Sequence, residues 1–266
     1  MLKIKNLIFI ALAVFTIGCS PYNKVLNKGT AEEKYKMATE LYESKKFSKA
    51  LRLFEIITPV YKGKPQMERI QYMVAQSYFN TKDFQSASYY FGRFSENFPK
   101  STKREEADFN GAKSAFLASP KYSVDQALTL EALAAFQKFI NSYPTSTRLE
   151  ESNNMVAELQ HKLEKKSFMI AKQYYDIGYF KSAITAFDNL TSEYLGTIYR
   201  EEAFYYKFKA SYELGVNSTY AKKLKRLNAA QKAFEKLKRN YPSSKFLKES
   251  KRMLERINKE KAILTS

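Results

Sequence analysis

One spacing pattern recurs along this chain and restricts its fold more than any other feature of the sequence. In each copy, an alanine is followed by Phe four residues later, by an apolar residue after three more, and by Phe or Tyr after another four. The five copies are Ala50, Phe54, Ile57 and Tyr61; Ala87, Phe91, Phe94 and Phe98; Ala132, Phe136, Phe139 and Tyr143; Ala183, Phe187, Leu190 and Tyr194; and Ala230, Phe234, Leu237 and Tyr241. Steps of four, three and four residues place side chains on one face of an α-helix. The pattern therefore predicts five helices that each bury one face.

Three of these predicted helices end at a proline that directly follows the last aromatic residue, at Pro99, Pro144 and Pro242. Proline disfavours helical backbone at the residue before it, so each marks a helix end. A small residue on a second, upstream helix precedes every copy: Ala38, Ala75, Ala112, Ala171 and Ala210. Small residues allow paired helices to approach closely, so we expect helical hairpins that stack on their neighbours.

This order of small residue, Tyr, Ala, Phe and Pro resembles the tetratricopeptide repeat family. The second copy matches the family pattern at Ala75, Tyr78, Ala87, Phe91 and Pro99. The resemblance implies an all-α fold, a right-handed superhelical solenoid of five tetratricopeptide-type helical hairpins over residues 30–243. Residues 244–266 carry an apolar stripe among many lysines and are predicted to form a C-terminal capping helix.

The first residues are typical of an export signal. Two lysines precede an apolar run from Leu7 to Ile17, which is too short to span a bilayer as a helix. The run ends in Thr-Ile-Gly-Cys19, which resembles a bacterial lipobox, and Cys19 is the only Cys of the chain. We therefore expect a lipoprotein signal peptide at residues 1–18 and a lipidated tether at residues 19–29.

The formal net charge of +18 favours acidic partners, although the 45 basic residues are mixed with 27 acidic ones along the chain, as on solvated helix faces. Export removes the chain from nucleic acid, so we expect anionic membrane surfaces and acidic protein faces as partners. A single Cys and a single His, His161, do not make a metal site of the usual ligand types. Because no phosphate-binding or nucleophile motif is found, we predict neither an enzyme nor a cofactor.

Candidate binding residues follow from the repeat resemblance, because in that family two positions of each first helix point into a groove. On this chain, the peptide-binding groove positions of the first three copies are Tyr35, Tyr42, Tyr72, Phe79, Phe109 and Phe116. Two interpretations stay open: the rings bind apolar peptide side chains, or they pack between adjacent first helices, with part of each ring still at the surface. A basic residue near the groove, Arg69, is positioned to meet a peptide carboxylate.

The predicted lipid anchor, the repeats and the Phe/Tyr-Pro repeat ends together resemble the BamD family of lipoproteins, subunits of the outer-membrane β-barrel assembly machine. The resemblance implies an outer-membrane location, anchored through the lipid on Cys19, at the periplasmic face. It implies a scaffold whose N-terminal repeats bind signals of unfolded outer-membrane proteins. The C-terminal repeats would bind the POTRA domain of a BamA-type barrel subunit, and for this docking we expect Lys236, Lys238 and Arg239 to contribute.

Two other protein classes are candidates for a chain with such repeats. A periplasmic repeat adaptor of the Tol/cell-division coordinator type normally carries a coiled coil before its repeats and a soluble signal, and neither pattern occurs here. A wall-active hydrolase with a repeat appendix requires a catalytic domain, for which the repeats leave no segment. The first of these remains the alternative to a barrel-assembly scaffold.

Overall fold

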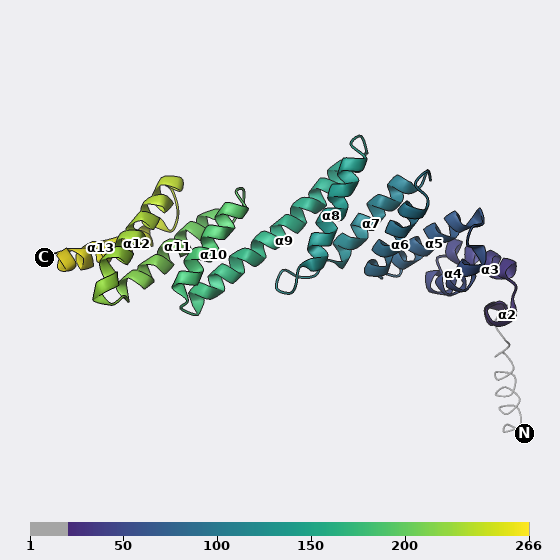
Figure 1. Ribbon diagram of the computed structural model, residues 1–266, viewed down its shortest axis with the longest axis horizontal. Helices are drawn as coiled ribbons and strands as arrows, with labels where there is room; N and C mark the ends of the chain where they lie inside the picture. The colour runs from purple at the N-terminus through teal and green to yellow at the C-terminus, as the bar shows by residue number, and fades with distance from the viewer. Residues whose placement is uncertain (1–20, 266) are drawn as a thin grey trace, which may run out of the picture. The chain divides into compact units, whose positions relative to one another are not determined.

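The computed structural model describes residues 21–265, so the predicted signal peptide and Cys19 lie outside the described residues. Twelve helices and no strand occur in this described range, which confirms the all-α prediction (Figure 1). The helices divide between two compact units. Unit 1 runs to Ser119 and also includes Ala127–Asn153, and unit 2 comprises Pro120–Gln126 and the chain from Asn154 onward.

Unit 1 is a series of helices in which each packs against the next (Figure 1). Its complete helices are α2 (Pro21–Lys28), α3 (Ala31–Glu43), α4 (Phe47–Tyr61), α5 (Gln66–Asn80), α6 (Phe84–Asn97), α7 (Arg104–Ala118) and α8 (Ala127–Ser142). The long helix α9 (Leu149–Asp176) begins in unit 1 and continues in unit 2. The remaining helices of unit 2 are α10 (Phe180–Glu193), α11 (Arg200–Val216), α12 (Tyr220–Asn240) and α13 (Leu247–Thr265).

The first three residues of each copy are buried in the core, as the spacing pattern predicts, while the fourth is buried only at Tyr61 and is half-buried in the other copies. The repeat alanines, from Ala50 to Ala230, are fully buried, and so are four of the five phenylalanines that follow them, while Phe234 is 2% exposed. The small residues of the upstream helices are likewise buried. An alanine at a helix crossing allows close approach, and the phenylalanine one turn later fills the space beside it.

The residues before proline leave the helical conformation where the sequence predicts it. Phe98 caps the end of α6 with φ −126° and ψ 65°, and Tyr241 caps α12 with φ −136° and ψ 71°. Tyr194 ends α10 in a similar conformation although no proline follows it. The first copy differs, because α4 continues through Pro59 to Tyr61.

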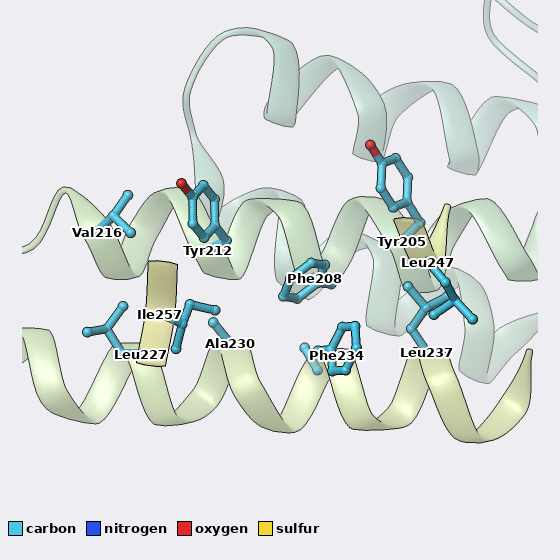
Figure 2. Close-up of a cluster of buried hydrophobic side chains, with 11 residues drawn as sticks. Tyr205, Phe208, Tyr212, Val216, Leu227, Ala230, Phe234, Leu237, Leu247 and Ile257 are labelled. Atoms are coloured by element: carbon cyan, nitrogen blue, oxygen red, sulfur yellow. The ribbon is translucent and has the colours of Figure 1, made fainter. Parts of the chain in front are cut away.

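The two ends of the described chain are helical and packed. Part of the segment expected to be a tether forms α2, whose Tyr22 and Leu26 pack against the core of α3 and α4. At the other end, α13 contributes Leu247 and Ile257 to the core between α11 and α12. Figure 2 shows these two side chains between the facing rows of α11 and α12.

Candidate binding site

Two of the six predicted groove residues, Tyr42 and Tyr72, line one cavity of about 440 Å³ in unit 1. The cavity lies between α3, α5, α6 and the turn before α7. Its other lining residues are Glu43, Pro65, Glu68, Arg69, Met73, Phe94 and Lys103. Arg69 thus lines the same cavity as these two aromatic residues.

The cavity is lined by buried apolar side chains and by two aromatic rings that are packed against other rings. Phe94 and Met73 are buried, and the ring of Tyr72 lies edge-on to Phe94 with 5.4 Å between the centroids. Tyr42 lies edge-on to Phe47 at 5.6 Å. Both tyrosines are half-buried and line the cavity, so part of each side chain packs and part remains accessible. Such rings provide a large contact area at a low entropic cost.

Two cations lie at the rim. Arg69 pairs with Glu43 at an N–O distance of 3.3 Å, and both side chains are more than half exposed. Exposed pairs of this kind contribute about 1 kcal/mol or less, so the guanidinium can exchange Glu43 for a ligand carboxylate at little cost. The ammonium of Lys103 lies 5.6 Å from the centroid of the Tyr72 ring and 3.0 Å from Glu106.

A polar network orients Tyr72. Its hydroxyl accepts a hydrogen bond of 2.9 Å from Gln76. Burial, and then a hydrogen bond to Glu106, raises the pKa of Tyr72 well above its ordinary value. Burial alone would raise the pKa of Glu106, but the hydrogen bonds from Tyr72 and Lys103 outweigh it, so this pKa is lowered. At neutral pH the cavity therefore presents a neutral Tyr72 held by a charged Glu106.

The other predicted groove residues do not join this cavity. Tyr35 packs on Tyr61 with 5.5 Å between the ring centroids, and Phe79 lies edge-on to Phe84 at 5.7 Å. Phe116 is half-buried in α7. These three rings therefore do not line the cavity with Tyr42 and Tyr72. The predicted groove residues do not form one continuous aromatic row.

For Phe109, the expectation that part of each ring stays at the surface is wrong. This ring is 1% exposed and packs edge-on against Phe139 at 5.5 Å. The guanidinium carbon of Arg148 lies 4.6 Å from the ring centroid and covers its outer face. Because Arg148 lies before α9, far along the chain, the groove position of Phe109 alone gives no sign of this cover.

Lys103, Glu106 and Phe94 are functional candidates that the groove positions do not include. Lys103 and Glu106 stand three residues apart at the start of α7, a spacing that favours an ion pair on a helix. That spacing is a signal available in the sequence. Their position over Tyr72 is not, because it depends on how the turn after α6 places α7 against α5.

The predicted docking residues lie near the C-terminal end of α12, in unit 2. Lys236, Lys238 and Arg239 are all exposed, while Phe234 and Leu237 on the same helix are buried. Positive charge in a last helical turn is also favoured by the helix dipole, which accounts for Lys238 and Arg239 without a partner.

A larger cavity of about 600 Å³ lies over α6, α7 and α8 and contains none of the predicted groove residues. Small residues, among them Gly92, Ala115 and Ala118, line much of it. Between residues 21 and 265 no cluster of His, Cys, Asp and Glu is suited to a metal ion, and no helix is long and apolar enough to cross a membrane.

Comparison with known proteins points to one family. Residues 27–227 match the family model YfiO, described as an outer membrane lipoprotein. The chain is 26% identical over 168 residues to a protein of Aquifex aeolicus provisionally named outer membrane protein assembly factor BamD, covering 60% of this chain and 53% of that protein. It is 24% identical over 185 residues to the outer membrane protein assembly factor BamD of Haemophilus influenzae, covering 65% and 70%. The chain thus spans about half the length of the Aquifex relative.

Two solved structures of a provisionally assigned kinesin light chain with TPR-like repeats, from Podosopora anserina, also align. Their TM-scores are 0.33 and 0.32 at 13% identity, with 79% and 80% of this chain and 93% and 96% of theirs covered. At scores this low the fold assignment rests on the helices described above.

Proposed function

Because this chain belongs to the YfiO family of outer membrane lipoproteins, with relatives named BamD, we propose that it is a lipid-anchored scaffold of the β-barrel assembly machine. It faces the periplasm and is held at the outer membrane by acyl chains on Cys19. Its relatives are named assembly factors, which favours binding over catalysis. Family membership also favours this function over a Tol-type repeat adaptor.

The observation that supports substrate binding is the cavity shared by Tyr42, Tyr72 and Arg69. We propose that it receives the C-terminal signal of an unfolded outer-membrane protein, a segment ending in an aromatic residue. About 440 Å³ is within the range of small-ligand pockets and accommodates one ring with its terminal backbone. Burial of a ring against Phe94, Tyr42 and Tyr72 supplies the apolar part of the affinity.

The rim cations supply the polar part. Arg69 presents a planar fork that matches a carboxylate, and Lys103 adds a second positive charge across the Tyr72 ring. The two carboxylates of the lining, Glu43 and Glu68, have partners of their own: Glu43 pairs with Arg69, and Glu68 accepts a hydrogen bond of 2.6 Å from Ser101. On binding, the terminal carboxylate of the peptide therefore replaces the Glu43 carboxylate as the partner of Arg69.

For the rest of the machine we propose a separate surface. The exposed Lys236, Lys238 and Arg239 of α12 bind an acidic face of the POTRA domain of a BamA-type barrel subunit. Rim charges of this kind mainly set the association rate and the salt dependence of a complex.

The test of the cavity is a cycle of two proteins and two peptides. A synthetic peptide ending in Phe is titrated by calorimetry into the wild type and Arg69→Gln, once with a free C-terminal carboxylate and once as the C-terminal amide. Amidation should weaken binding to the wild type by about tenfold or more and should have a clearly smaller effect on Arg69→Gln, in which only Lys103 remains at the rim. Arg93→Gln, at the larger cavity, is the matched control and should retain the full effect of amidation. An equal effect of amidation on all three proteins excludes Arg69 as the carboxylate receptor.

A further inference from the structure

Five exposed lysines gather around the first helix of the described chain. The set, here called the basic corner, comprises two residues of α2, two of the α3–α4 turn and one at the start of α4: Lys24, Lys28, Lys45, Lys46 and Lys49. Among residues 21–265, none of them forms an ion pair. The α2 sequence contains no acidic residue, and Glu43 at the end of α3 is engaged with Arg69. Within the described residues, the basic corner therefore presents five ammonium groups that no ion pair neutralises.

Helix α2 holds a defined position on unit 1. Tyr22 and Leu26 pack against the core of α3 and α4, and the Tyr22 hydroxyl donates a hydrogen bond of 3.4 Å to the carbonyl of Lys49. The ammonium of Lys49 lies 5.3 Å from the Tyr22 ring centroid. Because Tyr22 is in the first turn of α2 and Lys49 in the first turn of α4, the N-terminal end of α2 lies beside the start of α4.

The sequence limits how far this end can lie from the anchor. A single residue, Ser20, separates Cys19 from Pro21, the first residue of α2. Two residues span at most about 7 Å when fully extended. If Cys19 carries acyl chains, as in the proposed function, the start of α2 lies at the level of the lipid headgroups. At that distance the first turn of α2, and Lys49 beside it, lie within about one Debye length of the membrane surface, roughly 8 Å at physiological ionic strength.

We propose that the basic corner binds anionic lipid headgroups directly and acts as a second membrane signal beside the acyl chains of Cys19. Lysines next to an anionic surface each add to membrane affinity, and a basic patch makes anchoring by acyl chains stable. The exposed lysines lie on α2 and around the α3–α4 turn. The basic corner therefore holds unit 1 itself, and not only the N-terminal tether, against the bilayer. The inference rests on the proposed function for the position of the anchor. The short link between Cys19 and α2 brings a membrane surface to the basic corner, and no such link brings an acidic protein there.

The experiment uses the mature chain with Cys19→Ser, so that acyl chains make no contribution. Binding is measured by flotation with vesicles of phosphatidylcholine alone and with added phosphatidylglycerol, over a range of salt concentrations. We expect binding to the anionic vesicles only, weakening as salt rises. Lys45→Glu with Lys46→Glu and Lys49→Glu should lower the partition coefficient at least about tenfold. The control, Lys248→Glu with Lys251→Glu and Lys259→Glu, makes the same charge change on exposed positions of α13 and should bind nearly as the wild type does.

A second variant is needed because Lys49 also contacts Tyr22, so replacing Lys49 could weaken the packing of α2 as well as remove charge. Lys24→Glu with Lys28→Glu leaves that contact intact and should also weaken binding to anionic vesicles. Equal loss in the α13 control would show that net charge alone drives binding, and would overturn the inference. Wild-type binding that does not depend on phosphatidylglycerol would overturn it as well. Neither result bears on acylation of Cys19 or on peptide binding, so the failure of this inference is distinguishable from failure of the proposed function.

Discussion

The ring of Tyr72 on α5 lies edge-on to the ring of Phe94 on α6, with 5.4 Å between the centroids. Phe94 is fully buried, so Tyr72 belongs to the hydrophobic core as well as to the wall of the candidate cavity. Truncating Tyr72 to Ala would remove a ring that packs on the core, a change that costs up to about 3–5 kcal/mol when the ring is fully buried. Loss of peptide binding in that variant would not separate the two roles. Tyr42, whose neighbour Phe47 is only half-buried, offers a cleaner test.

We predict that Tyr42→Ala weakens binding of a Phe-terminated peptide by about 2 kcal/mol, or roughly thirtyfold, and leaves the helical circular dichroism spectrum unchanged. The reason is the loss of one wall of the cavity. The matched control is Phe79→Ala, at the equivalent groove position of the next repeat but outside the cavity, and it should bind as the wild type does. Calorimetric titration compares them. Equal weakening in both variants would mean that the aromatic positions act together and that the cavity has no special role.

Two helix-interior glycines should respond in opposite ways to substitution by Ala. A Cβ atom at Gly92 of α6 would meet no atom within 4 Å, so Gly92→Ala should stabilise the protein by about 0.5–1 kcal/mol through helix propensity. At Gly111 of α7 the same atom would lie 3.2 Å from the Cβ of Phe91, so the gain should be cancelled or reversed. Urea unfolding followed by circular dichroism measures both. A larger gain at Gly111 than at Gly92 would contradict the packing described for α6 and α7.

The docking of α13 should weaken in acid. Hydrogen bonding from Tyr205, at 2.7 Å, lowers the pKa of Glu249, and Lys209 lowers it further from 3.3 Å. A carboxyl group whose folded pKa is depressed contributes stability above its ordinary unfolded pKa of about 4.3. That contribution is lost as pH falls through the lower, folded value. Unfolding free energies measured from pH 7 downward should therefore decline more steeply for the wild type than for Glu249→Gln, and parallel curves would remove Glu249 from this role.

The basic end of α12 should control the rate of partner association. Reversing Lys236, Lys238 and Arg239 together to Glu should slow binding to an isolated POTRA domain, most clearly at low salt, because rim charges steer encounters. Stopped-flow or surface-based kinetics at two salt concentrations measures the rate. If the association rate does not change, these residues serve only as a solvated helix end.

The lipid anchor has a direct test. Cys19→Ala removes the only thiol of the chain, so metabolic labelling with palmitate should be lost and the protein should no longer resist extraction from membranes by high salt. A variant that remains labelled and salt-resistant would rule out Cys19 as the acylated residue.

The sequence alone was sufficient to predict the first three positions of each repeat as core residues. Burial on one face of a helix is a local property with a period of 3.6 residues, so the spacing of Ala87, Phe91 and Phe94 was sufficient to predict that all three are buried. Helix ends were predictable for a similar reason, because proline acts on the residue directly before it, as at Phe98 and Tyr241.

Only the tertiary structure decided which groove positions stay open. Phe109 and Tyr72 occupy equivalent positions in their repeats. Arg148 covers the ring of Phe109, whereas Tyr72, with Lys103 near its ring, still lines a cavity. Both contacts join residues more than one helix apart, and the turn that precedes α7 or α9 sets their geometry. A periodic pattern specifies which face of a helix is buried in its own hairpin. It does not specify which side chains of a later turn pack over that face, and the accessibility of the ring depends on those side chains.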